Sequence, residues 1–252
     1  MRKILTISMM ILFLTITLFA ESVDKKFKGA NDFYKKNKYN EAIAEYNEIL
    51  DKGYESSDLY YNLGNAYFKA GKIADAILFY ERAKRLAPHD EDIEFNLKIA
   101  NLKIVDKFNE VPKLFFIEWY ENIYGMFSSD SWAVLIIIFS FLTFTLLLGY
   151  FLIWNILARK LFFFGAVFSL FFTVACVIFA MEQSSIEGTR DSAIIFSPSV
   201  YIKSSPDKTS TDLFILHEGA KVKILDEVGG WKKIRIADGN VGWLPNKTIE
   251  VI

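Results

Sequence analysis

The sequence predicts a multidomain chain with an all-α repeat region, a two-helix transmembrane hairpin and an all-β barrel, in that order. Three observations predict this architecture. The first part of the chain repeats itself at an offset of 34 residues, and two long uncharged apolar runs follow it. The remainder holds short β-branched and aromatic runs separated by turn residues.

The N-terminus has the pattern of an export signal, so we expect residues 1–22 to be a signal peptide. Two basic residues precede an uncharged run over residues 4–20, and the small residues Ala20 and Ser22 favour cleavage before Val23. Cleavage directly after Ala20 is an alternative. The apolar run is long for a signal, so an uncleaved anchor helix is a second interpretation. Both interpretations place the mature chain outside the cytoplasm.

The two apolar runs predict a transmembrane hairpin. Residues 133–154 carry no charge, and at about 1.5 Å per residue they span roughly 33 Å, close to the thickness of a hydrocarbon core. Residues 161–181 form a second uncharged run, and a six-residue link with Arg159 and Lys160 joins the two. Neither run contains an acidic, basic or histidine residue, which argues against an ion path or a transport site.

Charge around the hairpin predicts its orientation. Arg159 and Lys160 lie in the short link, whereas the outer flanks carry acidic residues. The positive-inside rule therefore places the link in the cytoplasm and both flanks outside, in agreement with the export signal. We expect a protein of the bacterial inner (cytoplasmic) membrane with both soluble parts on the extracytoplasmic side. Residues 111–131 mix aromatic and charged side chains and predict an interfacial helix, or alternatively a linker folded against the repeats.

The second copy of the repeat resembles the tetratricopeptide consensus at positions Tyr60, Leu63, Gly64, Tyr67, Gly71, Ala76, Tyr80, Ala83 and Pro88. We expect an all-α tetratricopeptide module over residues 23–110, with repeats at 23–56 and 57–90. A capping helix is predicted over 90–106 from the apolar spacing that ends at Leu102 and Ile104. Two repeats and a cap are few for a continuous core, so a partner or a second copy is one way to supply the rest.

The tetratricopeptide resemblance implies a concave groove that holds an extended or helical peptide. An Asn amide both donates and accepts hydrogen bonds, and Lys35 or Lys69 is suited to meet a carboxylate. For any single residue, a solvated surface position is the alternative. The matching positions are Asn31, Tyr34, Lys35, Tyr61, Asn62, Asn65, Phe68, Lys69 and Asn96.

The C-terminal part, residues 193–252, predicts a small barrel. The pair Asp238-Gly239 is a strong hairpin signal, because glycine adopts the positive φ of a tight turn. The segment resembles bacterial SH3 domains of the extracellular kind, with motif residues at Gly219, Val222, Trp231, Gly239, Gly242 and Trp243. That resemblance implies an SH3-like surface that contacts cell-wall peptides or protein segments through Tyr201, Trp231 and Trp243. The alternative, favoured for Trp231, is a tryptophan in the barrel core.

Little in the sequence indicates chemistry. The single cysteine, Cys176, lies in the second apolar run, and His89 and His217 show no metal-ligand spacing. We therefore expect no catalytic residue, no metal and no cofactor. A cell-wall hydrolase needs a reactive Cys with His, or a metal site, and is excluded on that ground. We also expect no nucleic-acid partner.

The order of signal, tetratricopeptide repeats, membrane hairpin and SH3-like tail resembles BatE-like proteins of the aerotolerance (Bat) operon. This resemblance implies a role beside a MoxR-type ATPase and von Willebrand factor A domain proteins in an oxidative or envelope stress complex. The modules themselves predict a membrane-anchored adaptor or scaffold with protein partners. A tether that binds peptidoglycan through the barrel is the alternative.

The orientation is directly testable. A reporter that is active only in the cytoplasm, fused after Ile252, should remain silent, because an uncharged hairpin with a basic link returns the chain to the outer side. Fusion of the same reporter at Lys160 serves as the positive control. A bright signal from the C-terminal fusion would show that the predicted orientation is wrong.

Overall fold

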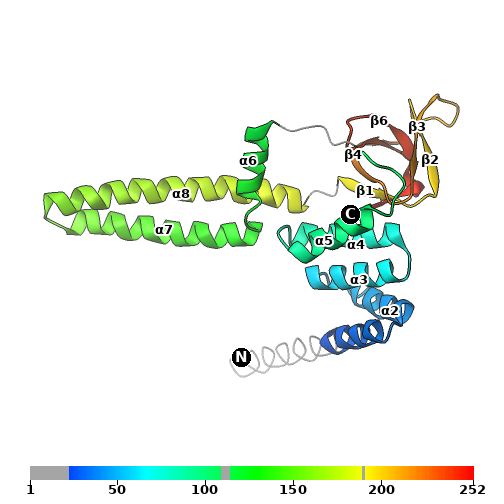
Figure 1. Cartoon of the computed structure of the whole chain (residues 1–252). Coiled ribbons are helices and arrows are strands. Elements are labelled where there is room, and N and C mark those ends of the chain that lie inside the picture. The colour runs from blue at the N-terminus through cyan, green and yellow to red at the C-terminus, as the bar shows by residue number, and fades with distance from the viewer. Residues whose placement is uncertain (1–22, 109–113, 189–190) are drawn as a thin grey trace, which may run out of the picture. The chain divides into compact units, whose positions relative to one another are not determined.

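The structure, a computed structural model, describes residues 23–108, 114–188 and 191–252 (Figure 1). The predicted signal peptide lies outside the described residues, as does the start of the predicted 111–131 segment. The described chain divides into two compact units. One unit contains the repeat helices together with the β-barrel, and the other contains the two long apolar helices and the short helix before them.

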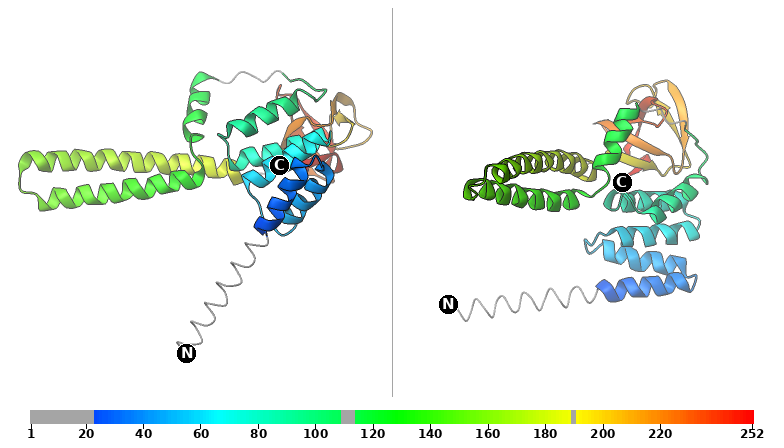
Figure 2. Two further views of the ribbon diagram at one scale, coloured as in Figure 1. Left: turned by 60° about the horizontal axis from the view of Figure 1, so that its bottom comes forward. Right: turned by 60° about the vertical axis from the view of Figure 1, so that its left-hand side comes forward.

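The repeat region is a stack of antiparallel helices that follow one another along the chain (Figure 2). Its members are a helix over residues 23–35, α2 (Tyr39–Leu50), α3 (Ser57–Lys69), α4 (Ile73–Leu86) and α5 (Glu91–Asn101). The hydroxyl of Ser56 accepts the backbone N–H of Leu59 at 3.1 Å and caps α3. Gly64 allows close packing, since a Cβ there would lie 2.7 Å from the ring of Tyr80.

The predicted capping helix is shorter than the sequence pattern suggests. We predicted residues 90–106, but α5 ends at Asn101, and Leu102 and Ile104 lie beyond it. Leu102 is exposed, whereas Ile104 approaches Gly219 of the barrel. Ile104 therefore belongs to a different contact from the one that buries α5, and Leu102 belongs to neither.

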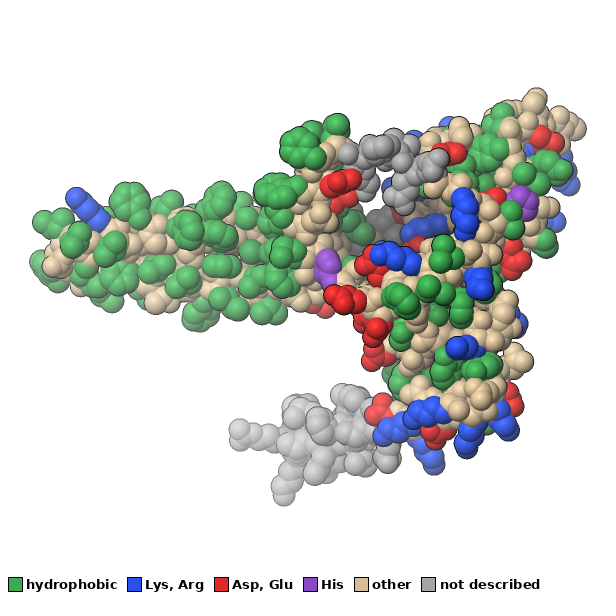
Figure 3. Space-filling model, viewed as in Figure 1, with side chains coloured by type: hydrophobic (Ala, Val, Ile, Leu, Met, Phe, Trp, Pro, Cys, Tyr) green, Lys and Arg blue, Asp and Glu red, His purple; other side chains and the backbone are tan. Residues whose placement is uncertain are grey.

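The second unit contains α6 (Phe115–Tyr124), α7 (Ser129–Leu152) and α8 (Ile156–Gly188). Helices α7 and α8 form a hairpin, and each is long and apolar enough to cross a membrane. Hydrophobic side chains cover the visible face of this hairpin in Figure 3. Between the helices, the Thr143 hydroxyl is 2.9 Å from the Ser169 hydroxyl, so polar groups on the inner faces satisfy each other.

The link between the two long helices is tighter than predicted. We predicted a link over residues 155–160, but α8 already begins at Ile156, so that Arg159 and Lys160 lie in its first turn. The side-chain oxygen of Asn155 accepts the backbone N–H groups of Leu157 and Ala158 at 2.9 and 3.1 Å. This capping interaction starts the helix early.

The C-terminal part is an antiparallel sheet in the order β3-β2-β6-β5-β4-β1-β7. Its strands are β1 (Ser192–Ile195), β2 (Ser199–Lys203), β3 (Asp212–His217), β4 (Lys221–Val228), β5 (Trp231–Arg235), β6 (Val241–Pro245) and β7 (Ile249–Val251), with a short 3₁₀ helix at Asn246–Thr248 before the last. Buried aliphatic side chains fill its interior, among them Ile195, Ile202, Leu216, Ile234 and Leu244. The helical region, the two apolar helices and the SH3-like sheet thus confirm the predicted fold class.

Within the first unit the barrel contacts α4. The Lys221 ammonium lies 2.8 Å from the carboxylate of Glu81, whose side chain is only 11% exposed. The Arg82 guanidinium donates to the carbonyl of Val251 at 2.6 Å and lies 3.6 Å from Glu250. The barrel therefore covers part of the surface that a short repeat stack would otherwise leave uncovered.

Packing in the stack can be tested with two alanines. Ala76 on α4 is fully buried, so Ala76→Leu should lower the free energy of unfolding by about 1–3 kcal/mol through overpacking. Ala44→Leu on α2 places the same side chain at an exposed position and should change stability little. Thermal unfolding followed by circular dichroism would measure both, and equal stabilities would contradict the close packing at Ala76.

Candidate partner-binding groove and barrel surface

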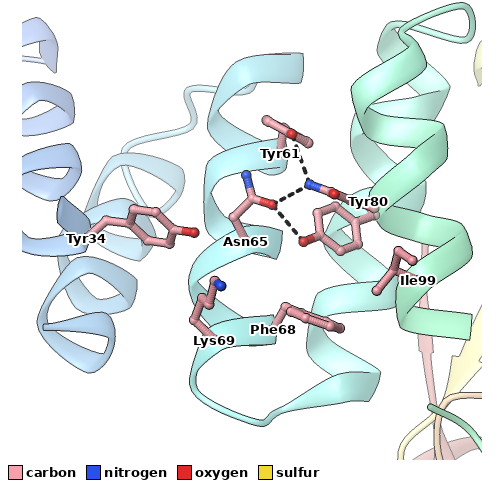
Figure 4. Close-up of a pocket in the computed structure, with 8 residues that line it drawn as sticks. Tyr34, Tyr61, Asn65, Phe68, Lys69, Tyr80 and Ile99 are labelled. Carbon is pink, nitrogen blue, oxygen red and sulfur yellow. Dashed lines mark hydrogen bonds between the residues drawn. The ribbon is translucent and has the colours of Figure 1, made fainter. Parts of the chain in front are cut away.

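The repeat stack contains a groove of about 270 Å³ across the inner face of α3 (Figure 4). Helix α3 supplies four of its lining side chains, and the flanking helices supply the others. The lining residues are Tyr34, Tyr61, Asn65, Phe68, Lys69, Tyr80, Asn96 and Ile99.

Asn65 is the hub of a hydrogen-bond network in this groove. Its side-chain oxygen accepts the Tyr80 hydroxyl at 2.7 Å and the amide of Asn96 at 2.8 Å. The Asn96 amide also donates to the Tyr61 hydroxyl at 2.9 Å. Figure 4 shows these bonds joining α3, α4 and α5.

The same network occurs one repeat earlier. The side-chain oxygen of Asn31 accepts the Tyr46 hydroxyl at 2.5 Å and the amide of Asn62 at 3.4 Å. Each of these three residues precedes its counterpart in the Asn65 network by 34 positions. The asparagines therefore form a repeating polar ladder along the groove, with one Tyr–Asn–Asn rung per repeat.

The tyrosines of the ladder act as donors. Burial raises the pKa of the Tyr46 and Tyr80 hydroxyls, because the charged phenolate is poorly solvated inside the stack. Both hydroxyls therefore stay protonated at neutral pH and donate to the Asn oxygens. The ladder fixes the spacing of the helices and the shape of the groove before any ligand arrives.

The structure brings most of the predicted groove residues together. Six of the nine line the groove, while Asn31 and Asn62 form the adjacent rung and Lys35 is an exposed residue outside the lining set. Tyr80 and Ile99 also line the groove but were not predicted. Tyr80 is a consensus position of the repeat, and Ile99 follows Asn96 by nearly one helical turn, a spacing that places both residues on the same face.

The groove offers a defined set of contacts to a ligand. Lys69 is its only charged lining residue in the described part of the chain, and its ammonium is exposed. Phe68, Ile99 and the tyrosine rings supply apolar surface around the bonded asparagines. A peptide with apolar side chains and one carboxylate matches this surface.

The barrel presents a second candidate surface. Strand register pairs Lys203 with Trp243 and Trp243 with Lys233, so these residues share the outer face of the sheet. Tyr201 lies on the same face, opposite Ile215, and is 58% exposed. The exposed side chain of Ile215 extends its apolar surface.

The tryptophans are not part of the barrel core, contrary to the interpretation favoured for Trp231. Both Trp231 and Trp243 are half-buried, and the buried cluster of the barrel consists of aliphatic residues. The Lys233 ammonium lies 6.0 Å from the centre of the Trp243 ring, a cation–π distance. Trp243 is therefore partly covered by a lysine that a ligand would have to move.

The described residues contain no group of three His, Cys, Asp or Glu side chains arranged to hold a metal ion. His217 instead lies 2.8 Å from a carboxylate oxygen of Asp106, within the same unit. His217 therefore has a structural partner in the linker that follows α5.

Two family models match parts of this chain. Residues 27–91 match the tetratricopeptide repeat, and residues 198–250 match the bacterial SH3 domain. The chain carries tetratricopeptide repeats and a bacterial SH3 domain. No curated protein sequence matches it significantly. Both matched domains are binding modules, and neither is a catalytic domain.

The ladder makes a prediction about Asn65. Asn65→Ala should lower the free energy of unfolding by about 1–3 kcal/mol, because the Tyr80 hydroxyl and the Asn96 amide lose their acceptor. Asn65→Asp retains an acceptor oxygen at that position, so it should lower the free energy of unfolding by less. Chemical denaturation of the two variants would compare them, and equal losses would show that the acceptor oxygen is not what matters.

Proposed function

We propose that the chain is a membrane-anchored adaptor of the bacterial cell envelope that binds an extended segment of a protein partner in the tetratricopeptide groove. The observation that carries this proposal is the combination of Phe68 and Lys69 beside the Asn65 ladder. The polar side chains of the ladder form hydrogen bonds with one another, so the groove is preorganised before a ligand binds. Lys69 and the aromatic rings remain available to a ligand.

The anchor in this proposal is the α7–α8 hairpin. Each helix exposes large apolar side chains along its length, a surface suited to lipid. The polar contacts between Thr143 and Ser169 face inward, as is usual for helices in a bilayer.

Chain order supports the proposed orientation. The helical stack precedes the hairpin in sequence and the barrel follows it, yet Glu81 and Arg82 contact the barrel. Parts in contact lie on the same side of a membrane. Two spans return the chain to its starting side, and the basic residues Arg159 and Lys160 at their junction favour the cytoplasm. We therefore place both soluble modules on the extracytoplasmic side.

Helix α6 suits the membrane interface. Phe115, Phe116 and Trp119 are all exposed on it, while Glu118 and Glu121 supply charge. An indole ring at headgroup depth keeps its polar edge in water and its ring against acyl chains. We propose that α6 lies in the interface, where it guides the chain into α7.

The partner class follows from the compartment and the domain order. Resemblance to BatE-like proteins makes a MoxR-type ATPase system and von Willebrand factor A domain proteins of the Bat operon the candidate partners. We propose that the chain assembles such a stress-response complex at the membrane. A segment with apolar side chains and a carboxylate is the chemistry that the groove would recognise.

A peptidoglycan tether is the second candidate function. The row of Tyr201 and Trp243 with Lys203 and Lys233 on the outer face of the barrel favours it, because aromatic and cationic side chains suit glycan rings and peptide carboxylates. This surface is separate from the groove residues, so the two functions can be tested independently.

The groove can be tested by crosslinking in intact envelopes. Phe68→Ala with Lys69→Ala should reduce recovery of the crosslinked partner about tenfold or more, since each lost contact of this kind costs about 1–3 kcal/mol. Lys52→Ala removes an exposed lysine outside the groove and should leave recovery unchanged. Unchanged recovery with the groove variant, its helicity intact, would contradict the proposal.

The tether is distinguished by sedimentation of the full-length protein with purified peptidoglycan. If the barrel binds the wall, Tyr201→Ala with Trp243→Ala should abolish co-sedimentation while the groove variant retains it. Wild-type protein that fails to sediment would exclude the tether.

A further inference from the structure

The linker that follows α5 has a regular pattern of burial. Ile104, Asp106 and Phe108 are partly buried, whereas Val105 and Lys107 between them are exposed. Alternation at every second residue is typical of an extended segment with one face against a neighbour. We refer to residues 104–108 as the strap.

Each inward residue of the strap contacts the barrel. Ile104 lies against Gly219, where a side chain would clash with it. Asp106 accepts the backbone N–H of His217 at 2.6 Å with one oxygen, and its other oxygen is 2.8 Å from the Nδ1 of the same residue. The Asp106 side chain is 12% exposed. Phe108 packs against the aliphatic core of the barrel.

These contacts give the strap a direction. As it advances from Ile104 to Asp106, its contacts in the barrel go back from Gly219 to His217, so it runs antiparallel to β3. Strand β3 is at one end of the sheet order, where backbone groups have no neighbouring strand. The Asp106 carboxylate thus accepts a hydrogen bond from the backbone N–H of His217 at the open edge of the sheet. At the other end, Arg82 donates to Val251 of β7.

We propose that the strap is a built-in ligand of the barrel and that the site it fills is a recognition site for extended protein segments. The segments that fit have an apolar residue, an acid and an aromatic residue at alternate positions. When the strap is released, a partner segment with this pattern takes its place along β3. This proposal does not depend on the groove, because none of its residues lines it.

The acid is the specific element of the pattern. A carboxylate has two acceptor oxygens, so one can contact the backbone N–H while the other contacts the ring nitrogen. An amide or a hydroxyl has only one oxygen and cannot make both contacts in this way. The aromatic residue adds burial in the barrel core. The two intervening positions have exposed side chains and accept any residue.

Covalent attachment keeps the site filled in the resting protein. A tethered ligand has an effective concentration on the order of millimolar, so a free segment of modest affinity competes poorly with it. Opening requires a stronger competitor or a change that lifts the strap from the barrel.

The test uses full-length protein in detergent micelles and a fluorescent peptide of residues 102–108. Asp106→Ala with Phe108→Ala should open the site, and the peptide should bind this variant about tenfold or more tighter than wild type. Val105→Ala with Lys107→Ala alters the same segment at its exposed positions and should behave as wild type. A peptide with Ala in place of its Asp should bind none of them. Fluorescence anisotropy measures the binding of both peptides to all three proteins.

Two results would overturn the proposal. One is equal binding of the peptide to wild-type and opened protein, which would show that the strap does not fill the site. The other is no binding to an opened variant whose β-sheet signal is intact. If the double variant does not fold, the single variant Asp106→Ala can be used to test by amide hydrogen exchange whether the strap covers β3. Exchange over residues 213–219 should accelerate in that variant and not in Val105→Ala, and unchanged exchange would refute the strap.

Discussion

Tyr80 does two things that the rest of the helical module depends on. Its ring fills the space that Gly64 leaves open on the neighbouring helix, and its hydroxyl donates to Asn65, the next residue of that helix. Asn65 in turn holds Asn96 of α5. One side chain therefore sets the spacing of two helices and connects the third, and the walls of the groove follow from it. The polar side chains of the groove form hydrogen bonds with one another, and this network holds the three helices in a fixed arrangement.

The modular architecture could be predicted from the sequence because each module has its own periodicity. The 34-residue repeat, the uncharged runs and the short β-branched runs are local signals, and helix or strand formation follows them directly. The role of Asn65 could not be predicted in this way. An asparagine on a helix face is compatible with a ligand contact or with an internal bond, and only the position of Tyr80 and Asn96 distinguishes the two.

The strap shows where a local pattern misleads. Leu102 and Ile104 continue the helical spacing of α5, and the sequence contains no proline or glycine there to end the helix. The helix ends because Ile104, Asp106 and Phe108 gain contacts with a barrel that lies far along the chain, since Asp106 and His217 are 111 positions apart. Tertiary contacts of this range override local propensity and have no local signature. Trp243 is a similar case, since Lys233 lies over its ring and the local sequence does not show this contact.

The long-range contacts between the helical stack and the barrel also have a consequence for biogenesis. The Glu81 contact to Lys221 spans 140 residues, and the hairpin is synthesised between them. In the proposed membrane topology, the barrel can dock on the stack only after both apolar helices have crossed the bilayer. In that topology, a molecule whose barrel stays on the opposite side of the membrane leaves Ile104, Phe108 and the carboxylate of Glu81 uncovered, and exposed segments of this kind are preferred sites of proteolysis. The proposed topology therefore couples correct insertion of the hairpin to resistance against proteolysis.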